Sequence, residues 1–384
     1  MRVLHVIDSL GLGGGAEHSL ADLLPHLRER GVDSQVITIR DRVGGLQERL
    51  IGEGFPVTVL SRPSVRGRIV DLKRQIVSQQ PDVVHATLYN SCMISRFACL
   101  GSRVPLVNSL VSTSYDRARL EGIGVPAWKM AAVASADAVT ARHLVSRIHA
   151  VNKAVADEAV SVLRVPPKRI TIIPRGRSTE SLGIWSEARR HLVRTRLGIN
   201  AETPLILNVG RQVHAKAQKD LIAAFDLIQR QLPEAVLLIA GRDGDASVEV
   251  RQALSNISYP NQVRLLGHRT DVADLYVAAD VMAFPSLYEG AAGGIIEAMA
   301  LGCPVVGSDA TAVSEVLRQG ELGPVVPRGN PHALARELLS MLRNPQRRES
   351  LRRTGLDEFQ KRYEITAVAN ATTDMYSQVI GESN

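Results

Sequence analysis

The stretch at 284–309 joins two short apolar strands through a loop of small residues and a helix. The first strand leads into the small-residue loop at 289–294, which opens a helix through 295–300. The residues Gly-Cys-Pro at 302–304 end that helix, and the second strand follows at 305–307. Two strands connected by a helix pair in parallel, with the helix packed on one face of the sheet. This stretch therefore predicts a parallel α/β sheet.

Short apolar strands alternate with helix-forming segments along the whole chain. In the first half we predict strands at 2–7, 35–39, 57–60, 82–86, 104–110, 136–140 and 170–173. In the second half we predict strands at 204–209, 236–240, 263–266, 281–284, 305–307 and 325–326. With 384 residues, the chain is also too long for one ordinary hydrophobic core. We therefore predict two Rossmann-like domains, at 1–180 and 200–357, with a linker at 178–203.

The composition is that of a globular protein, with 45% hydrophobic and 22% charged residues. Aromatic residues make up only 4%, which argues against a base-stacking surface and predicts no nucleic-acid partner. Cys92, Cys99 and Cys303 form no CxxC pair, so we expect reduced core thiols in a cytoplasmic protein. No apolar run approaches a membrane span, and the N-terminus lacks the flanks of a signal peptide.

The loop at 289–294 has features of an anion-binding site. Unpaired N–H groups and the helix dipole both point at a loop that precedes a helix. Glu289 and Glu297 bracket this loop. Carboxylates repel phosphate and are better suited to the hydroxyls of an attached sugar, so a nucleotide sugar would satisfy both features. The alternative is a buried strand–helix unit with two solvated glutamates.

A second motif follows the strand at 204–209. Gly210 lets the backbone turn, and Arg211 and Lys216 stand in the loop before the next helix. Two cations in such a loop suit a diphosphate.

The motif around Glu289 and Glu297, with Phe-Pro-Ser before it and Glu-Ala-Met-Ala-x-Gly-x-Pro-Val-Val at its end, resembles retaining nucleotide-sugar glycosyltransferases of family 4. The resemblance implies the GT-B fold, in which two Rossmann-like domains with parallel sheets face across a cleft. It also implies that Glu289 contacts the transferred sugar and Glu297 the ribose. Many relatives read Glu-Gly-Phe-Gly-Leu where this chain has Glu-Gly-Ala-Ala-Gly. In GT-B proteins the C-terminal helix, here at about 358–384, packs on the first domain.

The same resemblance extends to both halves of the chain. Gly210-Arg211 and Lys216 match the pair that neutralises the donor pyrophosphate, with Ala217 where Gly is usual. Pro-Asp-Val-Val-His, ending at His85, resembles the family's strand, but no histidine can be assigned as catalytic. Arg175 occupies the place of Asn in a familiar Ile-Pro-Asn-Gly turn.

These features give the predicted site residues. We predict catalytic roles for Glu289, Arg211 and Lys216, and donor-binding roles for Glu297, Gly290, Gly293, Gly294, Ile295, Gly210, Gly14, Gly15 and Arg242. On the acceptor side we predict His85 and Arg175. No metal ligands are predicted.

The expected activity is transfer of a sugar, with retention, from a nucleoside diphosphate sugar as co-substrate and without a cofactor. The stretch 141–200 holds twelve Lys or Arg residues and four acids, and such a band suits an anionic partner. Together with the usual roles of the resembled family, this basic band suggests a glycan or lipid-linked acceptor and peripheral contact with the inner membrane surface. The expected role is in cell-surface polysaccharide or lipid-linked glycan synthesis.

Alternative functions remain open at this point. A GT-B sugar-nucleotide epimerase would turn over a nucleotide sugar without an acceptor, and a non-catalytic relative would only bind it. The Gly11-x-Gly13-x-x-Ala16 match to a dinucleotide fingerprint leaves an NAD(P) oxidoreductase as a distant option. A glycosidase pair is disfavoured, because a hydrolase needs no cations beside its carboxylates.

Overall fold

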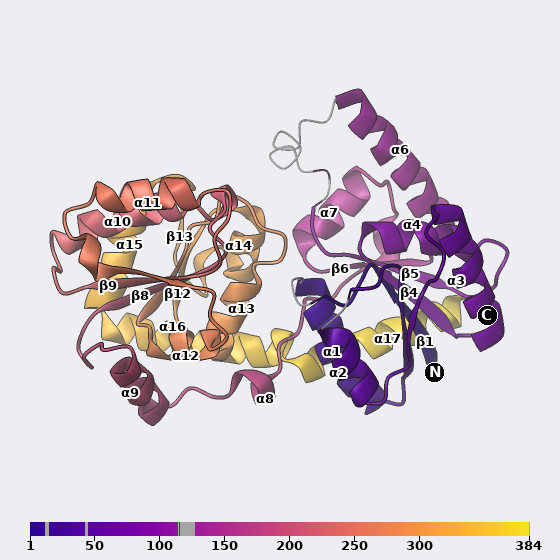
Figure 1. Ribbon diagram of the computed structural model, residues 1–384, viewed down its shortest axis with the longest axis horizontal. Helices are drawn as coiled ribbons and strands as arrows, with labels where there is room; N and C mark the ends of the chain where they lie inside the picture. The colour runs from indigo at the N-terminus through magenta and orange to yellow at the C-terminus, as the bar shows by residue number, and fades with distance from the viewer. Residues whose placement is uncertain (12–14, 43–44, 114, 116–126, 384) are drawn as a thin grey trace. The chain divides into compact units, whose positions relative to one another are not determined.

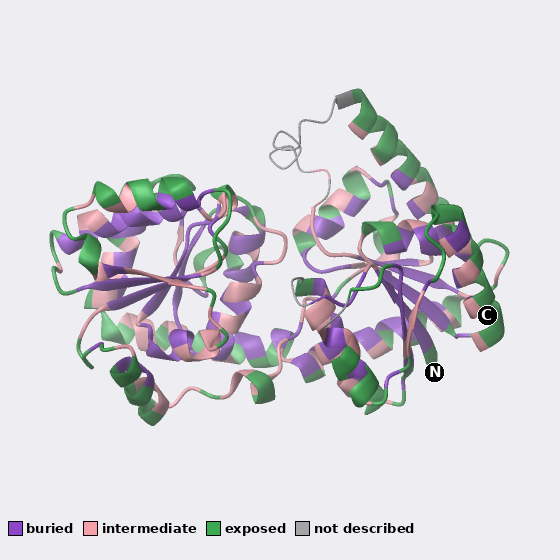
Figure 2. Cartoon of the chain, viewed as in Figure 1, coloured by how far each residue is buried: buried purple, intermediate pink, exposed green. Residues whose placement is uncertain are grey.

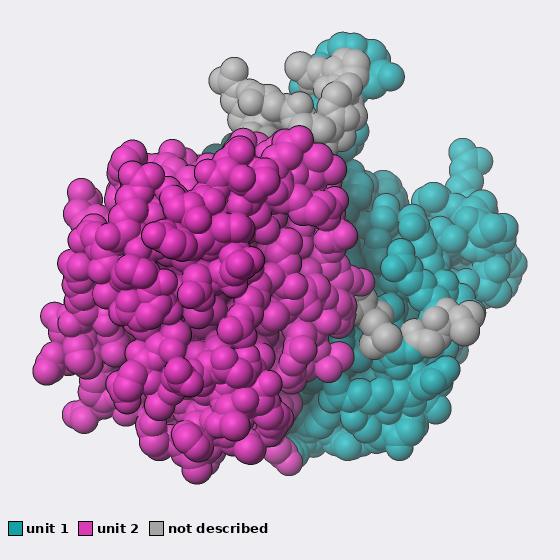
Figure 3. Space-filling model, turned by 60° about the vertical axis from the view of Figure 1, so that its left-hand side comes forward, with its two compact units in different colours: residues 1–176, 365–384 teal, residues 177–364 magenta. Residues whose placement is uncertain are grey.

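The computed structural model describes residues 1–11, 15–42, 45–113, 115 and 127–383. The chain forms two compact units, which Figure 3 colours separately. Unit 1 contains Met1–Gly176 and Ile365–Asn384, and unit 2 contains Arg177–Glu364. The predicted linker at 178–203 therefore lies entirely within unit 2. Leu182 and Trp185 pack against the unit 2 core there, and Val193 is buried in it.

Unit 1 is built on a seven-stranded parallel sheet with the order β3-β2-β1-β4-β5-β6-β7 (Figure 1). Its strands are β1 Arg2–Ile7, β2 Asp33–Thr38, β3 Val57–Val59, β4 Val83–Thr87, β5 Leu106–Leu110, β6 Arg147–Ala150 and β7 Ile170–Ile172. Its helices are α1 Gly15–Arg28, α2 Leu46–Gly52, α3 Val65–Gln79, α4 Tyr89–Ala98, α6 Ala127–Leu144, α7 Lys153–Ser161 and α17 Ile365–Ser383, with a 3-10 turn at Pro167–Arg169.

One predicted strand of unit 1 is wrong. Residues 136–140 lie inside helix α6, and strand β6 follows at Arg147–Ala150. The alanine-rich run of α6 favours a helix, and this local preference continues through Val139 and Thr140. The true strand was overlooked because Arg147 and His149 interrupt its apolar pattern.

The C-terminal helix α17 supplies part of the unit 1 core. Val368, Met375 and Tyr376 of α17 are buried together with Val3 of β1 and Val107 of β5. The helix begins at Ile365, seven residues after the predicted start, because a π-helical turn at Phe359–Tyr363 separates it from α16.

Unit 2 is built on a six-stranded parallel sheet with the order β10-β9-β8-β11-β12-β13. Its strands are β8 Leu205–Val209, β9 Val236–Ala240, β10 Val263–Gly267, β11 Val281–Phe284, β12 Val305–Ser308 and β13 Val325–Val326. Its helices are α8 Thr179–Leu182, α9 Glu187–Arg196, α10 Gln218–Gln229, α11 Ser247–Ser255, α12 Val272–Ala278, α13 Gly293–Ala300, α14 Thr311–Val316, α15 Pro331–Arg343 and α16 Pro345–Glu358. Short 3-10 turns lie at His214–Lys216, Pro260–Gln262 and Arg318–Gly320.

Each strand of unit 2 divides its residues between two cores. Leu205 and Leu207 belong to the core that includes α12 and α13, whereas Ile206 between them belongs to the core that includes α10 and α15. Alternate side chains of a strand point to opposite faces, so both faces of the sheet are covered by helices. Figure 2 shows the central strands of both sheets as almost continuously buried.

Many cations of the basic band at 141–200 have partners within their own unit. Arg190 donates to the carbonyl oxygens of Ala278 and Ala279 and pairs with Asp280 at 2.7 Å. Arg147 pairs with Glu382 at 2.6 Å. These side chains stabilise helix ends and hold α17, so the band is partly structural. Among the described residues, no helix combines the length and apolar character needed to span a membrane.

The unit 2 core predicts one stability result. Phe225 of α10 is fully buried, so Phe225→Ala should lower the free energy of unfolding by about 3–5 kcal/mol through lost contacts and the cavity left behind. Leu192→Ala removes a side chain of similar apolar character that is 51% exposed, and it should change stability by less than about 0.5 kcal/mol. Urea unfolding of both variants measures the difference. Equal losses would contradict the assignment of Phe225 to the core.

Candidate active site

Two loops of unit 2 that are distant in sequence lie side by side. Strands β8 and β11 are neighbours, so the loops after them leave the same edge of the sheet. The N–H of Leu287 donates to the carbonyl oxygen of Ala215 at 2.8 Å and ties these loops together. The carboxyl ends of parallel strands are where ligands bind in such sheets.

The two predicted motifs meet in an ion pair. Lys216 Nζ contacts Glu289 Oε1, and the Ser286 hydroxyl donates to the same oxygen at 2.9 Å. Both charged side chains are largely shielded, with 21% and 15% of their surface exposed. Lys216 Nζ also lies 5.0 Å from the centroid of the Phe284 ring, within the range of a cation–π contact. The sequence separation of 73 residues between Lys216 and Glu289 is thus closed by the sheet.

Small residues form the backbone at the start of helix α13. Ala292 adopts a left-handed conformation (φ 46°) immediately before it. A Cβ on Gly293 would lie 2.8 Å from Arg177 Nη2, and one on Gly294 would lie 3.2 Å from the Tyr276 hydroxyl. A side chain at 293 would therefore have to displace the Arg177 guanidinium. The first-turn N–H groups of α13 have no partner within the helix.

Glu297 is held by a residue that the sequence did not reveal. Arg177 Nε donates to Glu297 Oε1 at 2.8 Å, and both side chains are mostly buried. Arg177 is fixed by its own backbone, because its N–H donates to the carbonyl oxygen of Tyr363 at 2.8 Å. Its place beside a motif 120 residues away has no local signal.

The predicted cations Arg211 and Arg242 stand on adjoining backbone. The N–H of Gln212 donates to the carbonyl oxygen of Arg242 at 2.9 Å. Only glycine fits where these loops cross, since a Cβ on Gly241 would lie 1.9 Å from the carbonyl oxygen of Gly210. Arg211 and Arg242 are exposed, and within the described parts of the chain neither guanidinium forms an ion pair or hydrogen bond. Both are available to an anion.

A buried amide that sequence reasoning missed fixes the loop after β8. Gln218 Nε2 donates to Asn208 Oδ1 and to the carbonyl oxygen of Gly210, both at 3.0 Å. Asn208 in turn donates to the carbonyl oxygen of Ala283 at 2.9 Å and links β8 to β11.

The other predicted donor-binding residues are Gly290 and Ile295. Gly290 lies in the loop before α13, and Ile295 lies in the first turn of α13, where it is fully buried.

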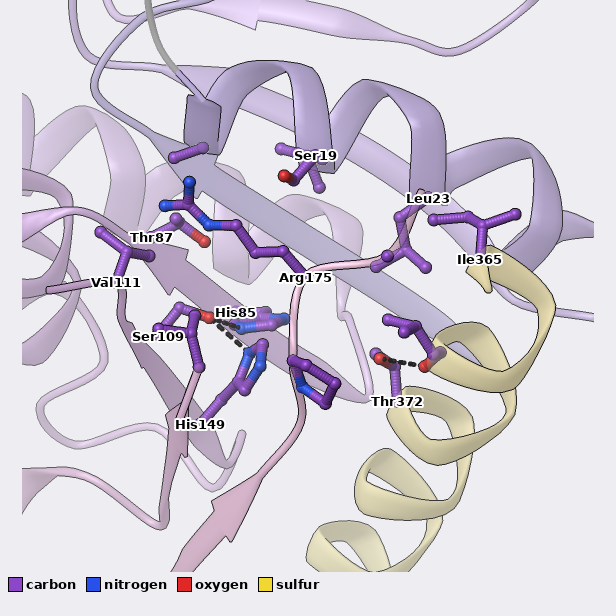
Figure 4. A pocket seen from close by; sticks show the side chains of 16 residues that line it. Ser19, Leu23, His85, Thr87, Ser109, Val111, His149, Arg175, Ile365 and Thr372 are labelled. Carbon is purple, nitrogen blue, oxygen red and sulfur yellow. Dashed lines mark hydrogen bonds between the residues drawn. The ribbon is translucent and has the colours of Figure 1, made fainter. Parts of the chain in front are cut away.

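The predicted acceptor-side residues line a cavity in unit 1 of about 60 Å³. Figure 4 shows Arg175 reaching across it towards Thr87, with His85, Ser109 and His149 grouped on one side. A Cβ on Gly15 would lie 2.9 Å from Arg175 Nη1, so α1 begins against this guanidinium. Gly14 lies outside the described residues.

A chain of hydrogen bonds runs along the floor of this cavity. His149 Nε2 lies 2.9 Å from the carbonyl oxygen of Ile173 and must donate to it. In a neutral imidazole, His149 Nδ1 then accepts from the Ser109 hydroxyl at 2.7 Å. Ser109 Oγ accepts from His85 Nε2 at 2.7 Å, and His85 Nδ1 accepts from the Tyr376 hydroxyl at 2.6 Å.

Burial keeps this chain neutral. It lowers the pKa of His149 to about 4 and, with the nearby His149 and His5, lowers the pKa of His85 well below its usual range. Each ring nitrogen of His85 and His149 is used within the chain, so neither imidazole offers a lone pair as a general base. Ser109 Oγ donates one hydrogen bond and accepts one, so it retains a second lone pair. His149 was missed because its strand was missed.

The comparisons with known proteins agree with this architecture. Residues 190–357 match the family model described as glycosyl transferases group 1, and residues 13–181 match Glycosyltransferase Family 4. The phosphatidyl-myo-inositol mannosyltransferase of Mycobacterium leprae is 28% identical, over 97% of this chain and 95% of that protein. The D-inositol 3-phosphate glycosyltransferase of Thermobispora bispora is 23% identical, over 97% and 92%.

A solved structure shows the same fold. The structure of Anabaena HepE in complex with UDP matches with a TM-score of 0.85 and 22% identity, covering 98% of this chain and 100% of that one. This likeness confirms the predicted GT-B fold of two Rossmann-like units on parallel sheets. Together with the family models, it supports a GT-B glycosyltransferase.

The neutral histidines predict a pH dependence of stability. The pKa of a histidine is near 6.5 in the unfolded chain, whereas burial lowers the pKa of folded His149 to about 4. Between these values the unfolded chain binds a proton that the folded chain does not, so the free energy of unfolding falls as the pH falls from 6.5 to 4. His149→Gln removes this titrating group. Between pH 6.5 and 4, the free energy of unfolding of the variant should therefore fall by about 3 kcal/mol less than that of wild type. Urea unfolding across the window measures it, and equal slopes would contradict a neutral His149.

Proposed function

We propose that this chain transfers a sugar, with retention at the anomeric carbon, from a nucleoside diphosphate sugar to an acceptor hydroxyl. The contact between Lys216 and Glu289 carries the proposal. In such a donor the diphosphate is bonded directly to the sugar, so a site for it needs a cation and a carboxylate side by side. The two loops of unit 2 supply them from separate motifs.

The positive groups around this pair suit the leaving diphosphate. Charge develops on the diphosphate as its bond to the sugar breaks, and fixed cations and N–H dipoles stabilise that charge. Arg211, Arg242 and Lys216 would provide the cations, and the first turn of α13 at Gly293 and Gly294 the N–H groups. We propose that these groups suffice without a metal ion.

Donor binding would exchange the partners of Lys216. A phosphate oxygen would compete with Glu289 for the ammonium group and free one carboxylate oxygen for a sugar hydroxyl. Ser286 still donates to that carboxylate and keeps it in place. Glu297, held by Arg177, would accept from the ribose hydroxyls.

The acceptor side is proposed for unit 1, with Arg175 and Ser109 as its polar groups. The relatives named for transfer to phosphatidyl-myo-inositol and D-inositol 3-phosphate support a lipid-linked or glycan acceptor, and the HepE complex supports a UDP-type donor. We propose a cytoplasmic protein in peripheral contact with the inner membrane surface, acting in polysaccharide or lipid-linked glycan synthesis.

Donor binding is tested by a thermal-shift screen against UDP, GDP, ADP and their sugars. A ligand that binds only the folded state raises the melting temperature by mass action. Arg211→Ala should weaken the active nucleotide by about tenfold to a hundredfold, since a bond to a charged group contributes about 1.5–3 kcal/mol. Arg336→Ala removes an exposed cation of α15 and should leave the shift unchanged.

The outcomes separate the candidate functions. If the protein is folded and no nucleotide changes its melting temperature, the proposed donor site is wrong. Conversion of the donor without an acceptor would indicate an epimerase, and a donor that binds but is never consumed would indicate a non-catalytic relative. Loss of transfer activity in EDTA, restored by a divalent cation, would contradict the metal-independent mechanism.

Glu289→Gln separates donor binding from turnover. The amide keeps the shape of the carboxylate but replaces a charge-assisted bond to the sugar by a neutral one, which is about half as strong. Turnover should fall by at least about tenfold, whereas nucleotide affinity should stay equal or rise because Lys216 loses its competing partner. Steady-state kinetics and nucleotide titration measure these effects. Equal turnover in the variant would remove Glu289 from the mechanism.

A further inference from the structure

The hydroxyl of Tyr276 in helix α12 is buried in unit 2 and makes no hydrogen bond to any residue that the structure describes. The residue is 1% exposed, and its ring belongs to the core that includes α13. Tyr376 of unit 1 is also fully buried, but its hydroxyl donates to His85 Nδ1 at 2.6 Å. An unpaired hydroxyl in a core lowers stability, and most buried polar groups are paired. The unpaired hydroxyl of Tyr276 therefore indicates a role beyond packing.

This hydroxyl lies against the first turn of helix α13. A Cβ on Gly294 would lie 3.2 Å from the Tyr276 hydroxyl and 3.3 Å from the Phe284 ring, so the helix backbone approaches both closely. Glu297 is three residues further along α13, and residues three apart share one face of a helix. The face of α13 that packs against the hydroxyl therefore also carries Glu297.

The carboxylate of Glu297 acts on Tyr276. Burial raises the pKa of Tyr276 well above its usual range, and the charge of Glu297 raises it further. The hydroxyl therefore keeps its proton and can donate it in a hydrogen bond to a carboxylate. Arg177 approaches the same carboxylate from the segment before α8, and its Nε donates to Glu297 Oε1 at 2.8 Å. Glu297 thus has a cation on one element and an unused hydroxyl donor on another.

A bound nucleotide would need Glu297 in one fixed orientation. The proposed function places the ribose hydroxyls on this carboxylate, and both must find an oxygen at the right distance and angle. A carboxylate offers about four lone-pair sites, so the bond from Arg177 leaves room for the ribose and for one more donor. A group that binds a ligand is held most precisely when neighbouring residues bond to it. Tyr276 supplies such a bond from the core.

We propose that Tyr276 is a positioning residue for the donor: when the nucleotide binds, its hydroxyl donates to Glu297 and holds the carboxylate towards the ribose. The inference rests on the proposed function, because the nucleotide donor is what brings the ribose. Tyr276 acts through Glu297 and does not touch the nucleotide. Its hydroxyl therefore has two effects of opposite sign, since it lowers the stability of the free protein and raises the affinity for the donor.

Tyr276→Phe tests the proposal, because it removes only the hydroxyl. The midpoint of urea unfolding should stay equal or rise, since an unpaired buried group is lost. Affinity for UDP, or for GDP or ADP if the thermal-shift screen selects one of them, should fall by about tenfold, since a hydrogen bond to a charged group is lost. Isothermal titration calorimetry measures the affinity.

Tyr376→Phe is the matched control. It also removes one hydroxyl from a fully buried tyrosine, but that hydroxyl is paired and lies in unit 1. The midpoint of urea unfolding should therefore fall, whereas nucleotide affinity should not change.

Two further measurements assign the effect to Glu297 and the ribose. The same nucleoside diphosphate without its ribose hydroxyls should bind wild type and Tyr276→Phe with equal affinity. In a Glu297→Ala background, Tyr276→Phe should weaken the complete nucleotide by less than about twofold, because the effects of two residues in one network do not add. If Glu297→Ala fails to fold, the nucleotide without ribose hydroxyls decides the question.

The outcomes distinguish this inference from the proposed function. Normal nucleotide affinity in Tyr276→Phe, or an equal loss with the nucleotide that lacks ribose hydroxyls, would overturn the role of Tyr276 and leave the donor site in place. A lower unfolding midpoint would show that the hydroxyl is already paired in the free protein and would also overturn the proposal. A folded wild-type protein that binds no nucleotide would overturn the donor site, and this inference with it.

Discussion

Burial of both faces of a parallel sheet determines where this chain can carry chemistry. Along β8, alternate residues enter two separate cores, so a polar side chain survives there only with partners. Asn208 does so, with hydrogen bonds to Gln218 and Ala283. The charged pair Lys216 and Glu289 lies in the loops beyond the strand ends. In unit 1, His85 and Ser109 lie within β4 and β5, and these buried polar side chains are likewise hydrogen-bonded to each other.

Sequence reasoning could predict most of the fold and the parts of the site that lie in local motifs. Lys216 and Glu289 each follow a strand at a short distance, and adjacent parallel strands bring such loops together. Arg177 and Gln218 could not be found this way. Arg177 reaches Glu297 only because its backbone bonds to Tyr363, and Gln218 reads as an ordinary residue at the start of a helix. These partners come from tertiary packing and not from spacing.

Unit 1 shows the same limit more strongly. Asp137 stands in an alanine-rich segment and reads as a solvated residue, yet it is buried against Arg96, which is 41 residues away. His149 belongs to a short strand whose pattern is interrupted by charge. The family resemblance does not replace this missing information, since it concerns motifs, and neither Asp137 nor His149 lies in one. The buried polar groups of unit 1 were therefore harder to predict than the two loop motifs of unit 2.

The path of the chain also sets the order in which the units can be completed during synthesis. All of unit 2 lies between the two segments of unit 1, and α17 follows it in the chain. A ribosome therefore delivers every residue of unit 2 before the helix that covers Val3 and Val107. Domains usually finish folding in order from the N-terminus. Here the sheet of unit 1 keeps apolar surface exposed until α17 has been synthesised. Nascent unit 1 therefore presents the kind of surface that chaperones bind.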